Sequence, residues 1–170
     1  MNVSEAVATR KTTRAFLTRA VPLETVQRIL EVAARAPSGG NLQPWKVYVL
    51  IGEARDELIR RVAEARLEHP MGERPEYLIY PPQLTEPYRT RRFRVGEQMY
   101  ATMGIPREDK AARLKFFSRN WEFFGAPVGM IFTVDRQMQQ GQWSDLGMFL
   151  QSIMLLAREH GLHTCPQEAW

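Results

Sequence analysis

Residues 33–51, AARAPSGGNLQPWKVYVLI, join the end of an amphipathic helix to the start of an apolar strand. The connection carries more than a simple change of direction requires, because Ser38, Gly39 and Gly40 follow one another before Asn41. Small residues let a flat or charged ligand approach the backbone closely, and the Asn41 amide can both donate and accept hydrogen bonds. The same residue types also occur in ordinary connections, so the loop alone leaves both interpretations open.

The flanks of this loop predict a helix and a strand. From Leu23 to Ala34 the apolar residues recur at helical spacing, and Pro22 suits the first turn of a helix. The run from Trp45 to Ile51 is rich in β-branched and aromatic residues, which is typical of a strand. Because this run is almost wholly apolar, we expect both faces of the strand to be covered.

The middle of the chain predicts charged helices around a long loop. A helix is expected over 53–66, and two more over 89–124, separated near Gly104, with an aromatic stripe that continues to Phe124. Five of the chain's 11 prolines lie between Pro70 and Pro87. Proline disrupts helices, so residues 68–88 are expected to form a loop or lid.

The last third predicts a second strand and a long core helix. Residues 126–134, APVGMIFTV, have the composition of a buried strand, and the helix over 144–161 would begin at Ser144 and stop at Gly161. LHTC, residues 162–165, is a candidate third strand.

Composition limits the class of protein. A chain of 170 residues with 44% hydrophobic and 25% charged residues predicts one globular domain, residues 1–170. No apolar run is long enough for a membrane span, and the N-terminus lacks a signal-peptide pattern, which favours a cytoplasmic protein without a membrane partner. With one cysteine, Cys165, and three scattered histidines, no metal site and no disulfide within the chain are expected.

Residues 9–16, TRKTTRAF, concentrate positive charge and hydroxyl groups. Arg10, Lys11 and Arg14 supply three cations within five residues, and Thr12 adds a hydroxyl. Guanidinium groups bind phosphate oxygens in charge-assisted pairs, so the segment suits a phosphate. A solvated basic turn is the competing interpretation, since short basic runs are common.

The order of these segments resembles the nitroreductase family of flavin mononucleotide (FMN) enzymes. RKTTRAF, then a helix ending in AARAPSGGNLQPW, then a strand, resemble its N-terminal half. GAPVGMIFTVD, WSDLGMFLQSIMLLAREHGL and TCPQEAW resemble its central strand, core helix and flavin-edge loop. The stretch 92–129 is similar to the nitrobenzoate-reductase branch. The resemblance implies an α+β fold with a central, mainly antiparallel sheet flanked by helices, normally in an intertwined homodimer.

The resemblance also implies a flavin site on matching positions of this chain. Arg10, Thr12 and Arg14 would hold the flavin phosphate, and Lys11 would add charge or a backbone contact. The ring would lie against the small-residue loop and a few residues near the C-terminus: Pro37, Ser38, Gly39, Asn41, Asn120, Glu168 and Ala169. Asn120 matches the family's ring-contacting asparagine only with a one-residue gap.

Two departures from the family pattern affect these expectations. Thr12 replaces the usual serine and keeps the hydroxyl. The chain ends at Trp170, where the family continues into a further strand and an arm that wraps the partner. The sequence is therefore expected to be shortened, with weaker flavin binding and a weaker dimer.

The activity implied is that of an FMN-dependent, NAD(P)H-using oxidoreductase. NADH or NADPH would deliver hydride to the flavin and leave, and a nitroaromatic compound or quinone would then take its place in a ping-pong reaction. No catalytic side chain is required, because the flavin performs the chemistry. The alternatives are another branch of the flavin superfamily, such as a reductive dehalogenase or a flavin-fragmenting enzyme, and a non-catalytic flavin-binding remnant.

A basic, aromatic stretch and the lone cysteine are weaker candidates for a function. YRTRRFR, residues 88–94, could clamp the carboxylate of an aromatic substrate or contact nucleic acid, but a solvated helix face is favoured and no nucleic-acid partner is predicted. Cys165 has no activating histidine or acid pattern, so a small buried residue is favoured over a nucleophile.

Overall fold

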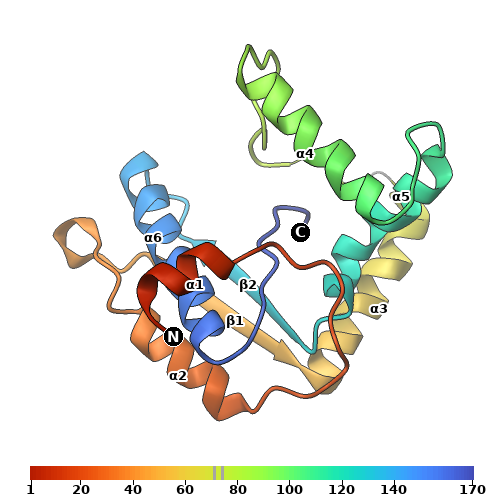
Figure 1. Cartoon of the computed structure of the whole chain (residues 1–170). Helices are drawn as coiled ribbons and strands as arrows, with labels where there is room; N and C mark the ends of the chain where they lie inside the picture. The colour runs from red at the N-terminus through yellow and green to blue at the C-terminus, as the bar shows by residue number, and fades with distance from the viewer. Residues whose placement is uncertain (71, 74) are drawn as a thin grey trace. The chain divides into compact units, whose positions relative to one another are not determined.

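The computed structural model describes residues 1–70, 72–73 and 75–170. These residues form two compact units (Figure 1). The first unit comprises Met1–Glu57 and Phe124–Pro166, and the second comprises Leu58–Phe123 and Gln167–Trp170. That residues 1–170 act as one domain stays a prediction.

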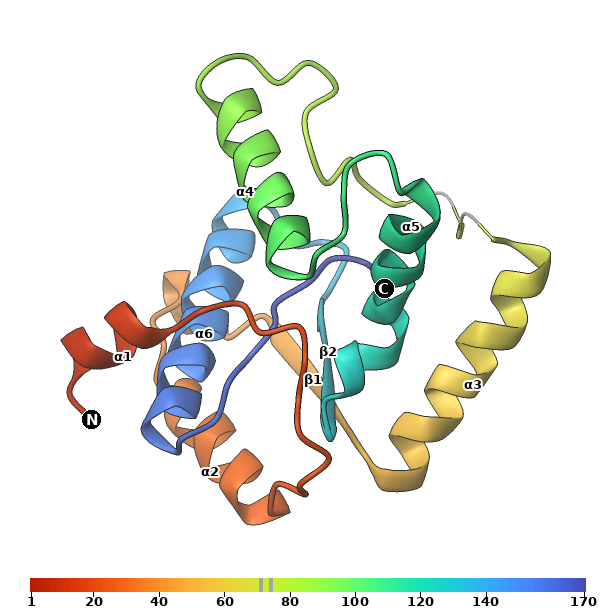
Figure 2. The ribbon, with the colours of Figure 1, turned by 45° about the vertical axis from the view of Figure 1, so that its right-hand side comes forward.

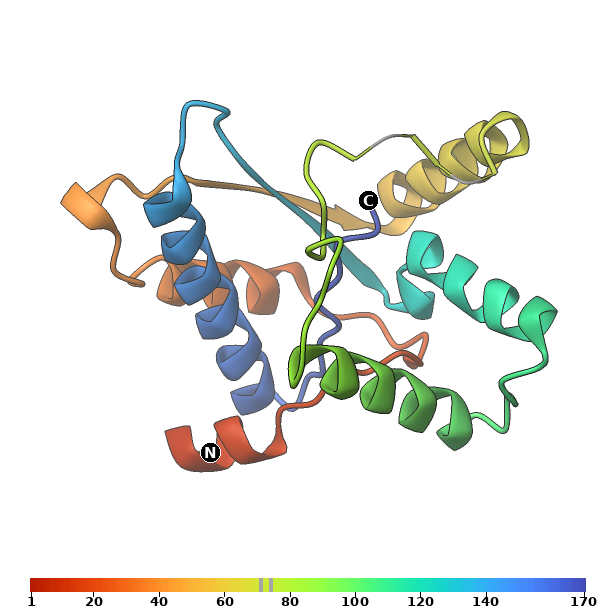
Figure 3. The same ribbon diagram turned by 90° about the horizontal axis from the view of Figure 1, so that it is seen from above.

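The first unit contains an antiparallel pair of strands, which cross one another in the view of Figure 3. Strand β1 (Trp45–Ile51) pairs with β2 (Val128–Val134), so that Trp45 lies opposite Val134. The apolar composition of both stretches produced the expected strands, and β2 begins two residues later than the predicted range of 126–134.

Only one face of this strand pair is packed on the core. Val47 and its cross-strand neighbour Phe132 contact the buried cluster, whereas Tyr48, one residue along the pleat, is 56% exposed. The expectation that both faces of β1 are covered is therefore wrong for this chain. The helices that supply the buried cluster contact only the alternating set of side chains that includes Val47.

Three helices build the core of the first unit: α1 (Val3–Thr9), α2 (Leu23–Ala33) and α6 (Gln140–Glu159). Helix α6 contacts both α1 and α2 (Figure 2). It presents buried side chains at intervals of three or four residues, as an amphipathic helix must. The cluster comprises Ile29, Ala33, Leu146, Phe149, Ile153 and Ala157.

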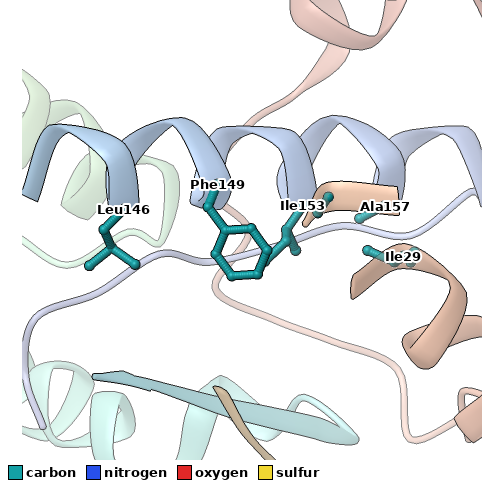
Figure 4. Close-up of a cluster of buried hydrophobic side chains, with 6 residues drawn as sticks. Ile29, Leu146, Phe149, Ile153 and Ala157 are labelled. Atoms are coloured by element: carbon teal, nitrogen blue, oxygen red, sulfur yellow. The ribbon is translucent and has the colours of Figure 1, made fainter. Parts of the chain in front are cut away.

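Phe149 is the centre of that cluster. Its side chain is 2% exposed and stacks on Trp45 of β1, with ring centroids 4.6 Å apart. Phe132 of β2 meets the same ring edge-on at 6.2 Å. Figure 4 shows Phe149 and Ile153 projecting from one side of α6. One aromatic side chain thus joins the core helix to both strands.

Helix α6 begins earlier than expected. Ser144 is not its N-cap, because Gln139 and Gln142 exchange side-chain-to-backbone hydrogen bonds in a capping box that starts the helix at Gln140. The stop is as predicted: the helix ends at Glu159, and Gly161 has a φ of 70°, the left-handed conformation that glycine adopts without strain.

Residues 162–165 do not form a third strand. They make one isolated parallel bridge, between Thr164 and Thr12. A single bridge places the basic segment beside residues 162–165 without extending the sheet.

Helices dominate the second unit. Helix α3 (Gly52–Glu68) begins in the first unit and continues into the second, which also holds α4 (Tyr88–Thr102) and α5 (Lys110–Ser118). The split near Gly104 is confirmed. Among the described residues between α3 and α4, none is helical, and Met71 and Arg74 of the predicted loop 68–88 lie outside the described residues.

The helix predicted to reach Phe124 ends at Ser118. A 3-10 segment, η2 (Arg119–Gly125), follows it. Phe123 and Phe124 have φ values of 49° and 52°, which an α-helix of L-residues does not accommodate. The aromatic periodicity therefore reflected burial of the two rings, which are 7% and 1% exposed, and not a continuous helix.

Candidate functional site

The basic segment is held against the C-terminal part of the first unit. The backbone N–H of Thr13 donates to the carbonyl of Thr164 at 3.0 Å, beside the Thr12–Thr164 bridge. Within the described residues, Arg10, Lys11 and Arg14 form no salt bridge with a carboxylate. Three cations thus gather on an ordered backbone without acidic partners, which is the arrangement that binds an anion.

Further positive charge surrounds this bridge. Burial lowers the pKa of the His163 imidazole, and the charges of Arg158 and Lys11 lower it further. Arg158 of α6 also donates to the carbonyl of Leu162 at 2.9 Å, which fixes its position near the segment. Arg158 was not among the residues expected from the sequence, where its only signal is a basic residue in the last turn of the core helix.

Two hydroxyl groups at the bridge lack partners. The Oγ1 atoms of Thr13 and Thr164 are buried and make no hydrogen bond to any part of the chain that the structure describes. A buried hydroxyl without a partner costs about 1–3 kcal/mol. A ligand with several acceptor oxygens would satisfy both hydroxyls, and the unpaired cations would neutralise its charge. The residues present therefore fit a phosphate group such as that of FMN.

Cys165 lies next to this cluster and is half-buried. Burial raises the pKa of its thiol, against the opposing charge of Arg14. A raised pKa disfavours the thiolate, which is the nucleophilic form. That Cys165 is not a nucleophile stays a prediction.

The small-residue loop adopts an unusual backbone. Gly40, Asn41 and Gln43 have φ values of 59°, 54° and 47°, within and just after the 3-10 turn η1 (Gly39–Asn41). Positive φ is uncommon for residues other than glycine, and it persists where the surroundings enforce it. The Ser38 hydroxyl accepts a hydrogen bond from the backbone N–H of Gln43 at 3.0 Å, which closes the loop on itself.

The loop is anchored to the core helix by Asp145. This residue is 7% exposed, and its Oδ2 accepts a hydrogen bond from the Gly39 N–H at 3.1 Å. Pro37, Gly39 and Asn41 remain exposed, so their surface is open to a ligand. Asp145 was not among the residues expected from the sequence, although it is an isolated acid in the apolar run WSDLGMFLQ.

The remaining predicted residues lie in the second unit. The Gln167 side-chain amide donates to the carbonyl of Asn120 at 3.2 Å, and the Trp121 indole N–H donates to the carbonyl of Ala169 at 3.0 Å. Glu168 accepts a hydrogen bond of 3.1 Å from the Tyr77 hydroxyl. The structure thus brings Asn120, Glu168 and Ala169 into one neighbourhood.

The Asn120 side chain has a structural partner. Its Nδ2 donates to the carbonyl of Phe117 at 2.7 Å, which caps the last turn of α5. The C-terminal segment is further held by Trp170, which stacks on Phe123 with centroids 4.6 Å apart. The roles of these residues toward a flavin stay predictions, as do those of the residues in the first unit.

No group of three or more His, Cys, Asp or Glu side chains arranged for a metal ion occurs in residues 1–70, 72–73 and 75–170. None of the helices described is both long and apolar enough to cross a bilayer.

The fold and the site together define an α+β protein with an unpaired cationic segment and an exposed, strained loop suited to a flat, phosphate-bearing ligand. A family model described as the nitroreductase family matches residues 7–170, and the chain belongs to that family. The family and the α+β fold expected from the sequence are confirmed.

Individual relatives agree with this assignment. The chain is 43% identical over 168 residues to a chloronitrobenzene nitroreductase of Comamonas testosteroni, covering 99% of this chain and 74% of the relative. It is 40% identical to a 4-nitrobenzoate reductase of Pseudomonas putida, covering 95% of this chain and 70% of the relative. The crystal structure of an FMN and NADPH-dependent nitroreductase, NfnB from Sphigopyxis sp. strain HMH, matches with a TM-score of 0.93 and 50% identity, covering 100% of this chain and 76% of that one.

Proposed function

We propose that this protein is an FMN-dependent oxidoreductase that uses NAD(P)H to reduce nitroaromatic compounds or quinones. The observation that carries the proposal is the match of the whole chain to an FMN and NADPH-dependent nitroreductase at 50% identity. The relatives named for chloronitrobenzene and 4-nitrobenzoate support a nitroaromatic acceptor.

The residues of the first unit would bind the cofactor. Arg10, Thr12 and Arg14 would hold the FMN phosphate, and Lys11 would add charge. The buried hydroxyls of Thr13 and Thr164 would donate to its remaining oxygens. The loop from Pro37 to Asn41 would lie against the ring, held in place by Asp145. When bound, FMN would supply the hydride chemistry that no side chain of this protein offers.

The residues of the second unit would act near the reacting edge of the cofactor. Backbone groups of Glu168 and Ala169 would face the ring, and the hydrogen bonds from Tyr77 and Trp121 would hold that backbone in place. Because Tyr77 belongs to the proline-rich loop 68–88, we also propose that this loop is a lid whose position is linked to Glu168.

The test is a spectroscopic cycle. The purified protein is loaded with FMN, desalted, and mixed with NADPH or NADH without oxygen. The expected result is a flavin absorbance band that bleaches with the nicotinamide and recovers when 4-nitrobenzoate or a quinone is added. A protein that retains no FMN after desalting, or one whose band never bleaches, would contradict the proposal.

We further propose a homodimer located in the cytoplasm. Family membership supports the dimer, as do large apolar side chains on the surface of the first unit: Leu17 is 76% and Leu42 is 56% exposed. Light scattering of the FMN-loaded protein tests it, and a monomer that binds FMN tightly would argue against a shared site. The cytoplasmic location rests on the single cysteine, and cell fractionation tests it.

A further inference from the structure

A pocket lies within the second unit, between the chain that precedes α4 and one face of that helix. It has a volume of about 480 Å³, within the range of small-molecule sites. The loop side consists of Pro81, Pro82, Gln83 and Leu84. Helix α4 contributes residues three or four apart along one face: Arg89, Arg92, Phe93, Gly96, Glu97 and Tyr100. Figure 2 shows the preceding chain folded back beside the start of α4.

The cations of this pocket exceed its available anions. The guanidinium of Arg92 lies over the ring of Tyr80 at 3.9 Å, and it pairs with no carboxylate in the described part of the chain. The carboxylate of Glu97 is already occupied, because Arg113 donates to both of its oxygens at 2.7 and 3.0 Å. Arg89 donates to Glu86 at 2.8 Å at the exposed end of the helix. Arg92 therefore remains as the cation able to accept an anionic ligand.

The apolar part of the pocket consists of two rings, each with a guanidinium over it: Arg107 lies over Phe93 at 5.3 Å and Arg113 over Tyr100 at 4.2 Å. Phe93 is 53% exposed, and Phe93 and Tyr100 flank Gly96 on the same face of α4. A glycine inside a helix is destabilising relative to alanine. Packing does not require it here, because a Cβ placed on Gly96 would meet no atom within 4 Å among the described residues. The missing side chain instead leaves bare helix surface between two rings.

We propose that this pocket binds a planar aromatic carboxylate, with the ring over Gly96 between Phe93 and Tyr100 and the carboxylate paired with Arg92. A guanidinium binds a carboxylate in a forked pair, and aromatic side chains favour a flat ring, so both parts of the ligand have a partner. The inference rests on the proposed function where it names the substrate class, namely nitroaromatics that carry a carboxylate. The binding site itself is testable without turnover.

The first experiment measures binding to the FMN-loaded protein by calorimetry or by chemical-shift changes, with benzoate and its neutral analogue benzamide as probes. Benzoate is expected to saturate in the millimolar range, and benzamide to bind at least about tenfold more weakly, as the loss of a charge-assisted pair implies. Equal binding of the two probes, or full competition by sulfate at the benzoate concentration, would overturn the proposal.

Variants then locate the site. Arg92→Gln is expected to weaken benzoate binding about tenfold or more, whereas Arg94→Gln, which removes the same charge from an exposed position of α4 outside the pocket, should change it less than about twofold. Gly96→Leu should abolish binding of both probes by filling the space over the helix. Equal effects of the two arginine variants would overturn the site. Should Arg92→Gln lose its helical circular dichroism, Arg92→Lys provides the second test, since it keeps the charge but not the paired N–H donors of the guanidinium.

Turnover separates this inference from the proposed function. Arg92→Gln is expected to lower kcat/KM about tenfold for 4-nitrobenzoate and to leave nitrobenzene, which lacks the carboxylate, nearly unchanged. Equal losses for both compounds would contradict carboxylate recognition. If neither compound is reduced by the unaltered protein, the proposed function fails, and the benzoate titration still decides whether the pocket exists.

Discussion

The carboxylate of Asp145 in the core helix accepts a hydrogen bond of 3.1 Å from the backbone N–H of Gly39 in the small-residue loop. The two residues are 106 positions apart in the chain, and the acceptor is 7% exposed. This hydrogen bond fixes a surface loop to α6, the core helix of the first unit. Its left-handed residues, Gly40 and Asn41, are held by this contact and by the turn itself.

Replacing Asp145 with alanine should therefore loosen the loop. The Gly39 N–H would lose its acceptor, which costs about 1–3 kcal/mol in the free energy of unfolding. If the loop lines the flavin ring, FMN affinity should fall about tenfold as well. Fluorescence titration of FMN and urea unfolding measure the two effects. Asp145→Asn keeps an oxygen acceptor at the same distance and serves as the control. Equal losses in both variants would mean that the charge of the carboxylate, and not its hydrogen bond to the loop, determines FMN affinity and stability.

Arg10 provides a test of phosphate binding. If it pairs with the FMN phosphate, Arg10→Met should weaken FMN binding about tenfold to a hundredfold, because a charge-assisted pair is lost. Riboflavin, which has the same ring but no phosphate, should bind the variant and the unaltered protein alike. Parallel titrations with the two flavins give this difference directly.

Arg19→Met is the matched control for that experiment. Arg19 is exposed and lies outside the 10–14 segment. Because it is also an arginine, its replacement changes the net charge by the same amount as Arg10→Met. It should leave FMN affinity within about twofold, since an exposed charge that does not pair with the phosphate is screened by salt. Similar losses for Arg10→Met and Arg19→Met would show a general electrostatic effect and remove Arg10 from the site.

Phe149 should dominate the stability of the first unit. Its ring contacts Trp45 and Phe132, so Phe149→Ala would remove packing between the core helix and both strands. Such a substitution costs about 3–5 kcal/mol. Urea unfolding followed by circular dichroism measures the loss, and Val3→Ala, at a position 74% exposed, should change the free energy of unfolding by less than about 0.5 kcal/mol. Comparable effects at the two positions would contradict this packing.

The parts of the fold that the sequence predicted well are those governed by local composition. The bounds of β1 were obtained correctly because an apolar, β-branched run stands between a proline-containing loop and Gly52. The start of α6 was missed because two glutamines formed the capping box, and serine at position 144 offered a more usual cap. The end of α5 was missed because burial of Phe123 and Phe124 imitated helical periodicity.

The residues of the candidate site likewise fall into those that local sequence could predict and those that it could not. The basic segment and the small-residue loop were identifiable from residue types at short spacing, together with the family resemblance. Asp145 and Arg158 were not, since their significance depends on contacts with Gly39 and Leu162. The aromatic and basic stretch at 88–94 was assigned mainly to a solvated face. The structure places Arg92 and Phe93 of that stretch in a pocket because the proline-rich chain folds back beside α4.

The pair of Glu97 and Arg113 should make stability depend on pH. Hydrogen bonds and charge from Arg113 hold the pKa of the Glu97 carboxyl below its ordinary value of 4.5. A carboxyl whose pKa is lower in the folded than in the unfolded protein binds fewer protons when folded, so its contribution is present above pH 4.5 and lost as the pH falls through the folded-state pKa. Glu97→Gln should therefore lower the urea midpoint near neutral pH, and the difference from the unaltered protein should shrink below pH 4.5. A double-mutant cycle with Arg113→Met isolates the pair, and a coupling that stays constant across this range would show that ionisation of Glu97 is not its source.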